Sequence, residues 1–139
     1  METLYRINSQ ITSTQHHLYS LNTHLEEKRQ ELERLALALS NLNDDKDGFQ
    51  RNERLCLAPE LSANTWHGQI AQQFQGLQEN EIQSGYFSIS VKQLGQVIYI
   101  LNEKIRETKQ SIINLRMDIS SQISMLNDLN EQKNTQMLK

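Results

Sequence analysis

The first side chains to consider for chemistry are three histidines and a carboxylate near the start of the chain: His16, His17, His24 and Glu31. Imidazole and carboxylate groups bind zinc when they converge on one ion at about 2 Å. His17 and His24 are seven positions apart, so in a helix they share a face but stand about 10.5 Å apart along its axis. That distance is too long for two ligands of one ion. The sequence therefore predicts no metal site and no cofactor.

Nucleophilic and phosphate-binding signatures do not emerge either. The single Cys56 has no histidine near it in sequence and cannot form an internal disulfide, so we interpret it as a reduced, inert thiol. The chain contains no HExxH, no CxxC and no glycine-rich phosphate loop. We therefore predict no catalytic residue and expect a binding protein, not an enzyme.

Composition narrows the class further. With 139 residues, 37% hydrophobic content and a mean hydropathy of -0.66, the chain suits one elongated domain with a narrow apolar seam. A net charge of -3 without a basic block argues against nucleic-acid binding. There is no signal-peptide pattern and no run of membrane-spanning length. We expect a cytoplasmic protein that does not insert into a membrane. If it is exported, we expect this to occur without a cleaved signal peptide.

A heptad pattern organises the first arm. Two series that step by sevens begin at Leu4 and Ile7, and ten of their twelve positions are apolar. Gaps that alternate between three and four place these side chains along one seam of a helix. No proline or glycine interrupts residues 1–47, so the pattern predicts one long helix that ends near Asn43 or continues to Leu57.

The polar side of this arm is unusual, because no Asp, Glu, Lys or Arg occurs from Ile7 to Leu25. An exposed coiled coil usually carries opposite charges beside its seam. A neutral polar face costs less to desolvate, so one interpretation is that a partner covers it. The other is a compositional habit of the source organism.

The second arm repeats the heptads, in series that begin at Leu94 and Ile98 and that Phe87 and Val91 extend backwards. They predict a long helix up to about Met137.

Strand-like sequences compete with this helix. Residues 86–92 alternate apolar residues with serine, and residues 97–101 are rich in β-branched types. Because the heptads continue through both stretches, we favour helix, bent near Gly85 or Gly95.

Between the arms, Pro59 disfavours helical geometry at Ala58, and Asn64 or Thr65 can cap a helix that begins at Trp66. The prediction is an all-α fold, a long antiparallel helical hairpin or coiled coil in a single domain. Its arms span about 2–57 and 66–138, with the turn at about 58–65. Since the second arm is longer, we expect its last turns, beyond about Ser120, to lack an intramolecular mate.

Trp66 and Gly68 stand together at this turn, although the chain has one tryptophan and five glycines. The indole can cover the open end of the seam, and a glycine lets the opposing backbone approach.

A Trp-Xaa-Gly turn in a long helical hairpin resembles the small Trp-Xaa-Gly proteins of type VII secretion. The surrounding "LSANTWHGQIAQQF" resembles the branch encoded beside LXG-type toxins in Gram-positive bacteria, of the YwqH type. Its pattern is matched by Thr65, Trp66, Gly68, Ala71 and Phe74.

This resemblance implies a helical partner that binds the N-terminal domain of an LXG toxin, with or without a second small helical protein, and delivers it for export. The candidate interface is the seam: Leu18, Leu21, Leu25, Ile105, Ile112 and Ile119.

The resemblance also implies an export signal, an aromatic residue followed four positions later by an acid. Tyr99 with Glu103 matches it, and so does Phe49 with Glu53. On a helix this spacing puts both side chains on one face. Otherwise Tyr99 is a residue that flanks the seam.

Two other functions stay open. The chain can be a generic coiled-coil scaffold or structural homodimer, or a phage or chaperone-like helical adaptor. A scaffold should form a stable homodimer alone, whereas a dedicated partner should depend on its toxin.

Overall fold

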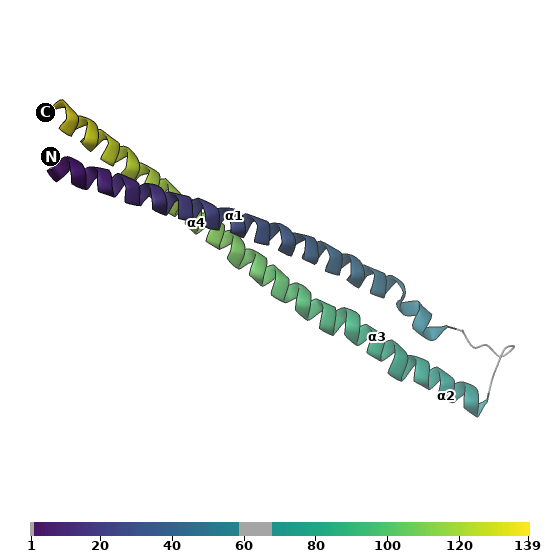
Figure 1. Cartoon of the computed structure of the whole chain (residues 1–139). Helices are drawn as coiled ribbons and strands as arrows, with labels where there is room; N and C mark the ends of the chain where they lie inside the picture. Colours follow the sequence, from purple (N-terminus) through teal and green to yellow (C-terminus); the bar gives the residue numbers. More distant parts are fainter. Residues whose placement is uncertain (1, 59–67) are drawn as a thin grey trace. The chain divides into compact units, whose positions relative to one another are not determined.

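The computed structural model describes residues 2–58 and 68–139, and every regular element in these ranges is helical. The elements are α1 (Glu2–Arg51), the 3-10 helix η1 (Glu53–Leu57), α2 (Gln69–Leu77), the π-helix η2 (Gln78–Gln83), α3 (Ser84–Ser88), the π-helix η3 (Ile89–Gln93) and α4 (Leu94–Leu138). The predicted all-α hairpin of two long helices is confirmed (Figure 1). The strand-like stretches 86–92 and 97–101 are helical, as their heptads indicated.

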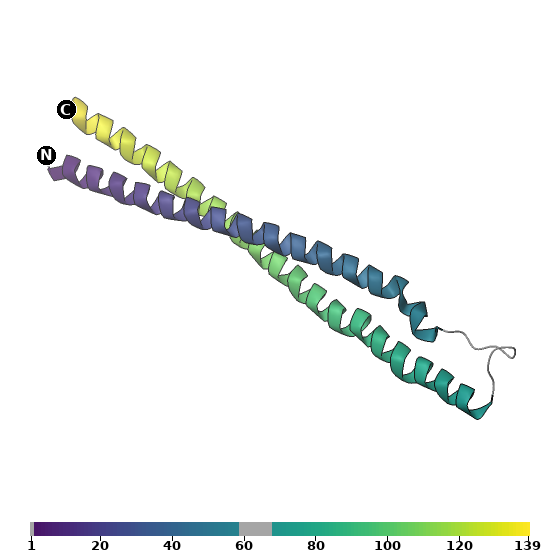
Figure 2. The same cartoon turned by 45° about the vertical axis from the view of Figure 1, so that its right-hand side comes forward.

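The chain divides into two units. Unit 1 combines Met1–Arg34 with Ile105–Lys139, and unit 2 is Leu35–Lys104. Helices α1 and α4 each contribute to both units. In unit 1, the start of α1 and the end of α4 lie side by side in both views, so the two helices run antiparallel (Figures 1 and 2).

The core of unit 1 consists of two apolar clusters along the predicted seam. One contains Ile7, Ile11 and Leu129, with Leu126 packed against them. The other contains Leu25, Ile112 and Leu115, with Leu21, Leu32 and Ile119 packed against them. Removing one such side chain from water stabilises the fold by about 1.5–3 kcal/mol. All ten positions belong to the two predicted series of their helices, so the seam of unit 1 closes within one chain.

These clusters also fix the register. Position 7 meets position 129 and position 25 meets position 112, so the numbers of facing residues have a nearly constant sum. The prediction that the last turns of α4 lack a mate is wrong, because Leu129 is buried against Ile7 and Ile11. Further along, Gln136 lines a hollow together with Thr3. The prediction failed because it assumed that the extra residues of the longer second arm extend past the first arm at the C-terminal end.

The polar positions of the seam fall into two layers. In this register, Thr14 of α1 is level with Gln122 of α4, and Lys28 is level with Thr108. The Lys28 ammonium forms an ion pair of 3.1 Å with Glu31. The Thr108 hydroxyl is buried and has no hydrogen-bond partner among the described residues. Unit 1 therefore carries one unsatisfied polar group in an otherwise well-packed seam.

Unit 2 packs differently. Its buried side chains, among the described residues, are Ala71, Gln78 and Ser90. The larger apolar side chains that the structure describes in unit 2 are half-buried or exposed. Helix η1 contacts η2 and α3. The rings of Phe49 on α1 and Tyr86 on α3 stack at 5.0 Å between centroids, tilted by 39°.

The π-helix η3 explains why the heptads cannot be continued backwards from α4 to Val91 and Phe87. A π turn holds more residues than an α turn, so it shifts which positions face the partner helix. Ser90 is buried, whereas Phe87 and Val91 are 49% and 41% exposed. The prediction that Phe87 and Val91 extend the seam is therefore wrong. In the second arm, the helix departs from regular α-helical geometry at residues 78–83 and 89–93, which form π-helices.

The first arm ends close to its predicted limit. Helix α1 passes Gly48 and reaches Arg51, and η1 carries helical structure on to Leu57. Ala58 then has extended geometry, with φ -88° and ψ 141°. This is the conformation that the following Pro59 imposes on its neighbour.

Candidate partner-binding surfaces

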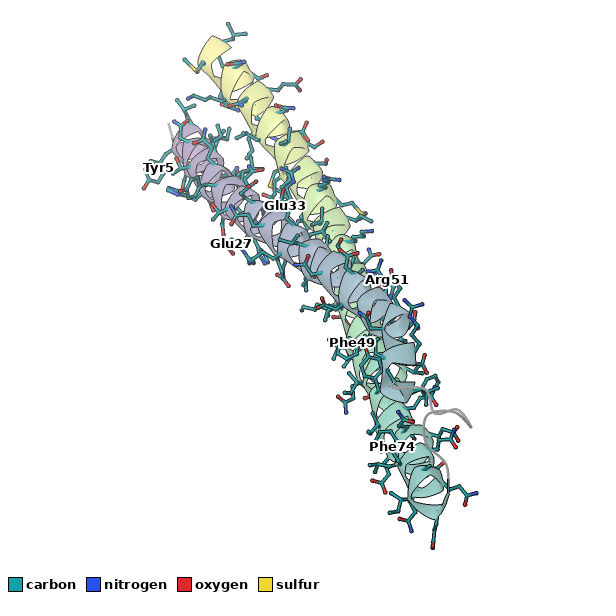
Figure 3. The ribbon with its side chains drawn as sticks, turned by 90° about the vertical axis from the view of Figure 1, so that its right-hand side faces the viewer. Tyr5, Glu27, Glu33, Phe49, Arg51 and Phe74 are labelled. Atoms are coloured by element: carbon teal, nitrogen blue, oxygen red, sulfur yellow. The ribbon has the colours of Figure 1, made fainter. Side chains whose placement is uncertain are left out.

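The uncharged face of unit 1, which we define as the exposed side chains of residues 8–24 on α1, contains no formally charged group. Tyr19 belongs to this face, and Tyr5 lies just beyond its first residue. Tyr5 is 78% exposed and Tyr19 is 75% exposed, and Figure 3 shows Tyr5 projecting outward from α1. A shallow hollow beside Tyr5 is lined by Tyr5, Asn8, Ser9, Thr12, Ser13 and His16. Sequence reasoning identified the absence of charge but missed these two rings. Tyr5 and Tyr19 are two heptads apart, and this spacing could have revealed them.

Two hydroxyl groups on this face already donate a hydrogen bond to their own helix. The Thr12 hydroxyl donates to the Asn8 carbonyl at 3.1 Å, and the Thr23 hydroxyl donates to the Tyr19 carbonyl at 3.0 Å. A polar group that keeps its hydrogen bond loses little when a partner displaces water from it. The face is therefore inexpensive to cover, and its tyrosine rings supply apolar contact area.

The turn motif is described in part. Trp66, together with the predicted caps Asn64 and Thr65, lies outside the described residues. In α2, Ala71 is 5% exposed, and Phe74 is half-buried three positions later (Figure 3). Ala71 and Phe74 therefore lie on the same side of the helix.

Gly68 has a backbone conformation that gives a reason for glycine at this position. A Cβ at this position would meet no described atom within 4 Å, so Gly68 does not make room for an opposing backbone among the described residues. Its φ of 103° and ψ of -170° lie in a region that is essentially restricted to glycine. Gly68 directly precedes Gln69, the first residue of α2. The glycine therefore sets the direction in which the chain enters the second arm.

The candidate seam residues lie inside the helix pair. Leu25 and Ile112 are buried in one cluster, with Leu21 and Ile119 packed against it. The two other candidates, Leu18 and Ile105, are half-buried. These side chains present little surface to a partner, so contact through them would require α1 and α4 to separate locally in unit 1.

The candidate export pair occupies α4 within unit 2. Tyr99 is 67% exposed, so its ring is accessible. Glu103 is half-buried and already takes part in an interaction of its own chain. In the second match, the half-buried Phe49 ring packs against Tyr86 within unit 2.

The pKa of one titratable group, the Tyr86 hydroxyl, is shifted next to this ring contact. Partial burial raises the pKa of the Tyr86 hydroxyl, and the negative charges that Cys56 and Glu53 can carry raise this pKa further. Cys56 is a half-buried free thiol.

In the described part of the chain, no group of three or more His, Cys, Asp and Glu side chains is arranged to hold a metal ion. No described helix combines the length and hydropathy needed to cross a membrane.

Comparison with known proteins gives one match. The model of a protein family described as YwqH-like matches residues 8–131, which covers both arms and the turn between them. No curated protein and no solved structure matches the chain.

Proposed function

Because the chain belongs to the YwqH-like family, we propose that it is a helical partner that binds the N-terminal helical domain of an LXG-type toxin and directs it to type VII secretion. The proposed role is one of binding, without catalysis. The family match over residues 8–131 is the observation that carries this proposal. A third component, a second small helical protein, fits the same assembly.

The uncharged face is the proposed toxin-binding surface. The apolar seam is occupied by the contacts between α1 and α4 in unit 1, so a partner meets the outer side of the pair first. There it finds exposed rings at Tyr5 and Tyr19, and the hydroxyls of Thr12 and Thr23 already donate to their own helix. A toxin helix with an apolar stripe can pack on such a surface without stranding a buried charge.

Co-purification tests this proposal. The full chain is expressed with the N-terminal domain of the LXG protein encoded beside it, and size exclusion with light scattering reports the complex. Adding charge with Ser9→Glu and Tyr19→Glu should weaken the complex at least about tenfold, because each carboxylate would be desolvated on binding. The matched control, Leu37→Glu with Ser40→Glu, changes the same chemistry at exposed positions of α1 in unit 2 and should leave binding unchanged.

A stable 1:1 complex that only the first pair weakens supports the proposal. Equal effects of both pairs would move the toxin site away from the uncharged face. A chain that forms a tight homodimer and ignores the toxin would leave the generic scaffold as the function.

Tyr99 and Glu103 are the proposed export signal of this assembly. The exposure of the Tyr99 ring supports it. Secretion of the toxin into the medium should fall in Tyr99→Ala, while the cytoplasmic complex still forms. Loss of the complex itself in Tyr99→Ala would assign the residue to assembly instead of export.

A further inference from the structure

A second surface belongs to α4 within unit 2. It shares Tyr99 with the proposed export pair, but it contains no residue of the proposed toxin-binding face. We call it the Gly95 hollow, and it is lined by Val91, Lys92, Gly95, Gln96, Tyr99 and Ile100. Its floor is Gly95, where an added Cβ would meet no described atom within 4 Å. Its walls include Tyr99 and Ile100, which are 67% and 63% exposed. The hollow is thus an apolar notch between large side chains.

The π-helix η3 builds one side of this surface. It turns Val91 and Phe87 away from the seam, so that both stay partly exposed. In a regular α-helix, residues four apart drift around the axis, and a wider π turn counteracts this drift. Phe87, Val91 and Gly95 therefore follow one line that leads to the Tyr99 ring.

We propose that the Gly95 hollow receives Tyr99 from a second copy of this chain. Gly95 and Tyr99 are four positions apart, which is about 6 Å along the helix. If two α4 helices pack antiparallel about a two-fold axis at residue 97, each Tyr99 ring lies over Gly95 of the other copy. Such an interface is self-complementary, and the missing Cβ lets the two helices approach closely.

The charges beside the hollow fit the same symmetry. Lys92, Gln96, Tyr99 and Glu103 recur at steps of four, three and four, so they share one side of the helix. Lys92 and Glu103 stand at nearly equal distances on either side of residue 97. The two-fold axis therefore brings Lys92 of one copy to Glu103 of the other, twice per dimer. This complementarity of the chain with itself is the reason to assign the hollow to a second copy.

The size of the contact sets the expected strength. Two aromatic rings and their aliphatic neighbours bury roughly 1,000 Å² in total, which is below the range of stable dimers. We therefore expect a reversible dimer with a Kd in the micromolar range. Because the uncharged face belongs to unit 1, this dimer does not depend on the proposed toxin binding.

Sedimentation velocity of the full chain over a concentration series tests the dimer. Gly95→Leu fills the notch with a good helix former, so it should raise the Kd at least about tenfold while helicity and melting temperature are kept or increased. The matched control is Gly85→Leu. Gly85 is also helical with no described atom near its Cβ, but it does not line the hollow, so dimerisation should not change.

A charge exchange tests the symmetry. Lys92→Glu places two carboxylates at each end of the interface, and Glu103→Lys places two ammonium groups there, so each variant alone should dimerise more weakly. Mixing the two variants restores opposite charges at both ends of a mixed dimer. The mixture should therefore associate at least about fivefold more tightly than either variant. Glu103 also interacts within its own chain, so its variant is compared with the mixture and not only with the native chain.

A chain that stays monomeric up to about a millimolar, or a dimer that Gly95→Leu does not weaken, would overturn the proposal. A monomeric chain whose toxin complex is lost in Gly95→Leu would assign the hollow to the toxin helix. The failure of toxin binding alone, with a concentration-dependent dimer intact, would overturn the proposed function and leave this inference standing.

Discussion

Unit 1 and unit 2 are built from the same two long helices, yet they bury different kinds of side chain. Unit 1 encloses large aliphatic residues such as Ile7, Leu25 and Ile112, in a heptad seam whose described helices contain no π turn. Unit 2 encloses a small residue and two polar ones, Ala71, Gln78 and Ser90, and contains both π-helices.

The difference shows what strict periodicity provides. Where gaps of three and four alternate, every turn returns an apolar side chain to the same seam. Where a π turn intervenes, the seam passes to whichever residue the extra position brings inward, and apolar side chains such as Phe87 stay at the surface. Unit 1 thus buries large aliphatic side chains in its seam, while unit 2 leaves the large apolar side chains next to its π-helix η3, such as Phe87 and Val91, partly exposed.

The largest expected effect comes from the core of unit 1. Ile112→Ala removes a side chain that is 6% exposed, so it should lower the free energy of unfolding by about 2–4 kcal/mol. Its neighbour Ile113 is 49% exposed, and Ile113→Ala should cost less than about 1 kcal/mol. Urea unfolding followed by circular dichroism measures both. Equal losses would break the comparison, because the seam would then not be the source of stability.

The next effect concerns the entry to α2 in unit 2. Gly68→Ala forces a side chain into φ 103°, so it should destabilise by about 1–3 kcal/mol. Gly85→Ala, in helical geometry with no described atom near its Cβ, should stabilise by up to about 1 kcal/mol. Opposite shifts in melting temperature are expected. A harmless Gly68→Ala would show that the glycine conformation is not required.

A smaller gain is expected in unit 1 from Thr108→Val. The buried Thr108 hydroxyl lacks a partner among the described residues, so an isosteric apolar side chain should stabilise by about 1 kcal/mol. The control Thr135→Val, at an exposed position of α4, should change stability by less than about 0.5 kcal/mol. Chemical unfolding in parallel compares the two. If Thr108→Val destabilised the chain, the hydroxyl would have a structural role in the seam.

The smallest effect is a titration in unit 2. Because the pKa of Tyr86 is raised in the folded chain, the unfolded chain loses this proton first as pH increases. The stability contributed by the protonated phenol is therefore complete below the ordinary tyrosine pKa, near pH 10, and is lost as pH rises from there through the folded pKa. In an absorbance titration at alkaline pH, Tyr86→Phe should remove the component that ionises last. Removal of an earlier component would contradict the assignment.

The sequence predicted the site only where periodicity was enough. It located the uncharged face and the exposed Tyr99, because both follow from residue types and helical spacing. It missed the Gly95 hollow, although Gly95 with Tyr99 four positions later was visible, because the exposure of Val91 depends on the π-helix η3 that contains it. The seam residues, Leu25 and Ile112 among them, were proposed for a partner, and the structure places them against each other.

The sequence by itself determined that the chain forms two long helical arms, that the first arm stops before Pro59, and which side of each pairs in unit 1. These features depend on local spacing and on breakers such as Pro59, whose effects are short-range. Only the tertiary structure decided the register, the glycine geometry at Gly68 and the inward turn of Ser90. A heptad seam accepts shifts by whole heptads, and the choice among them depends on contacts such as that of Ile7 with Leu129, which are far apart in sequence.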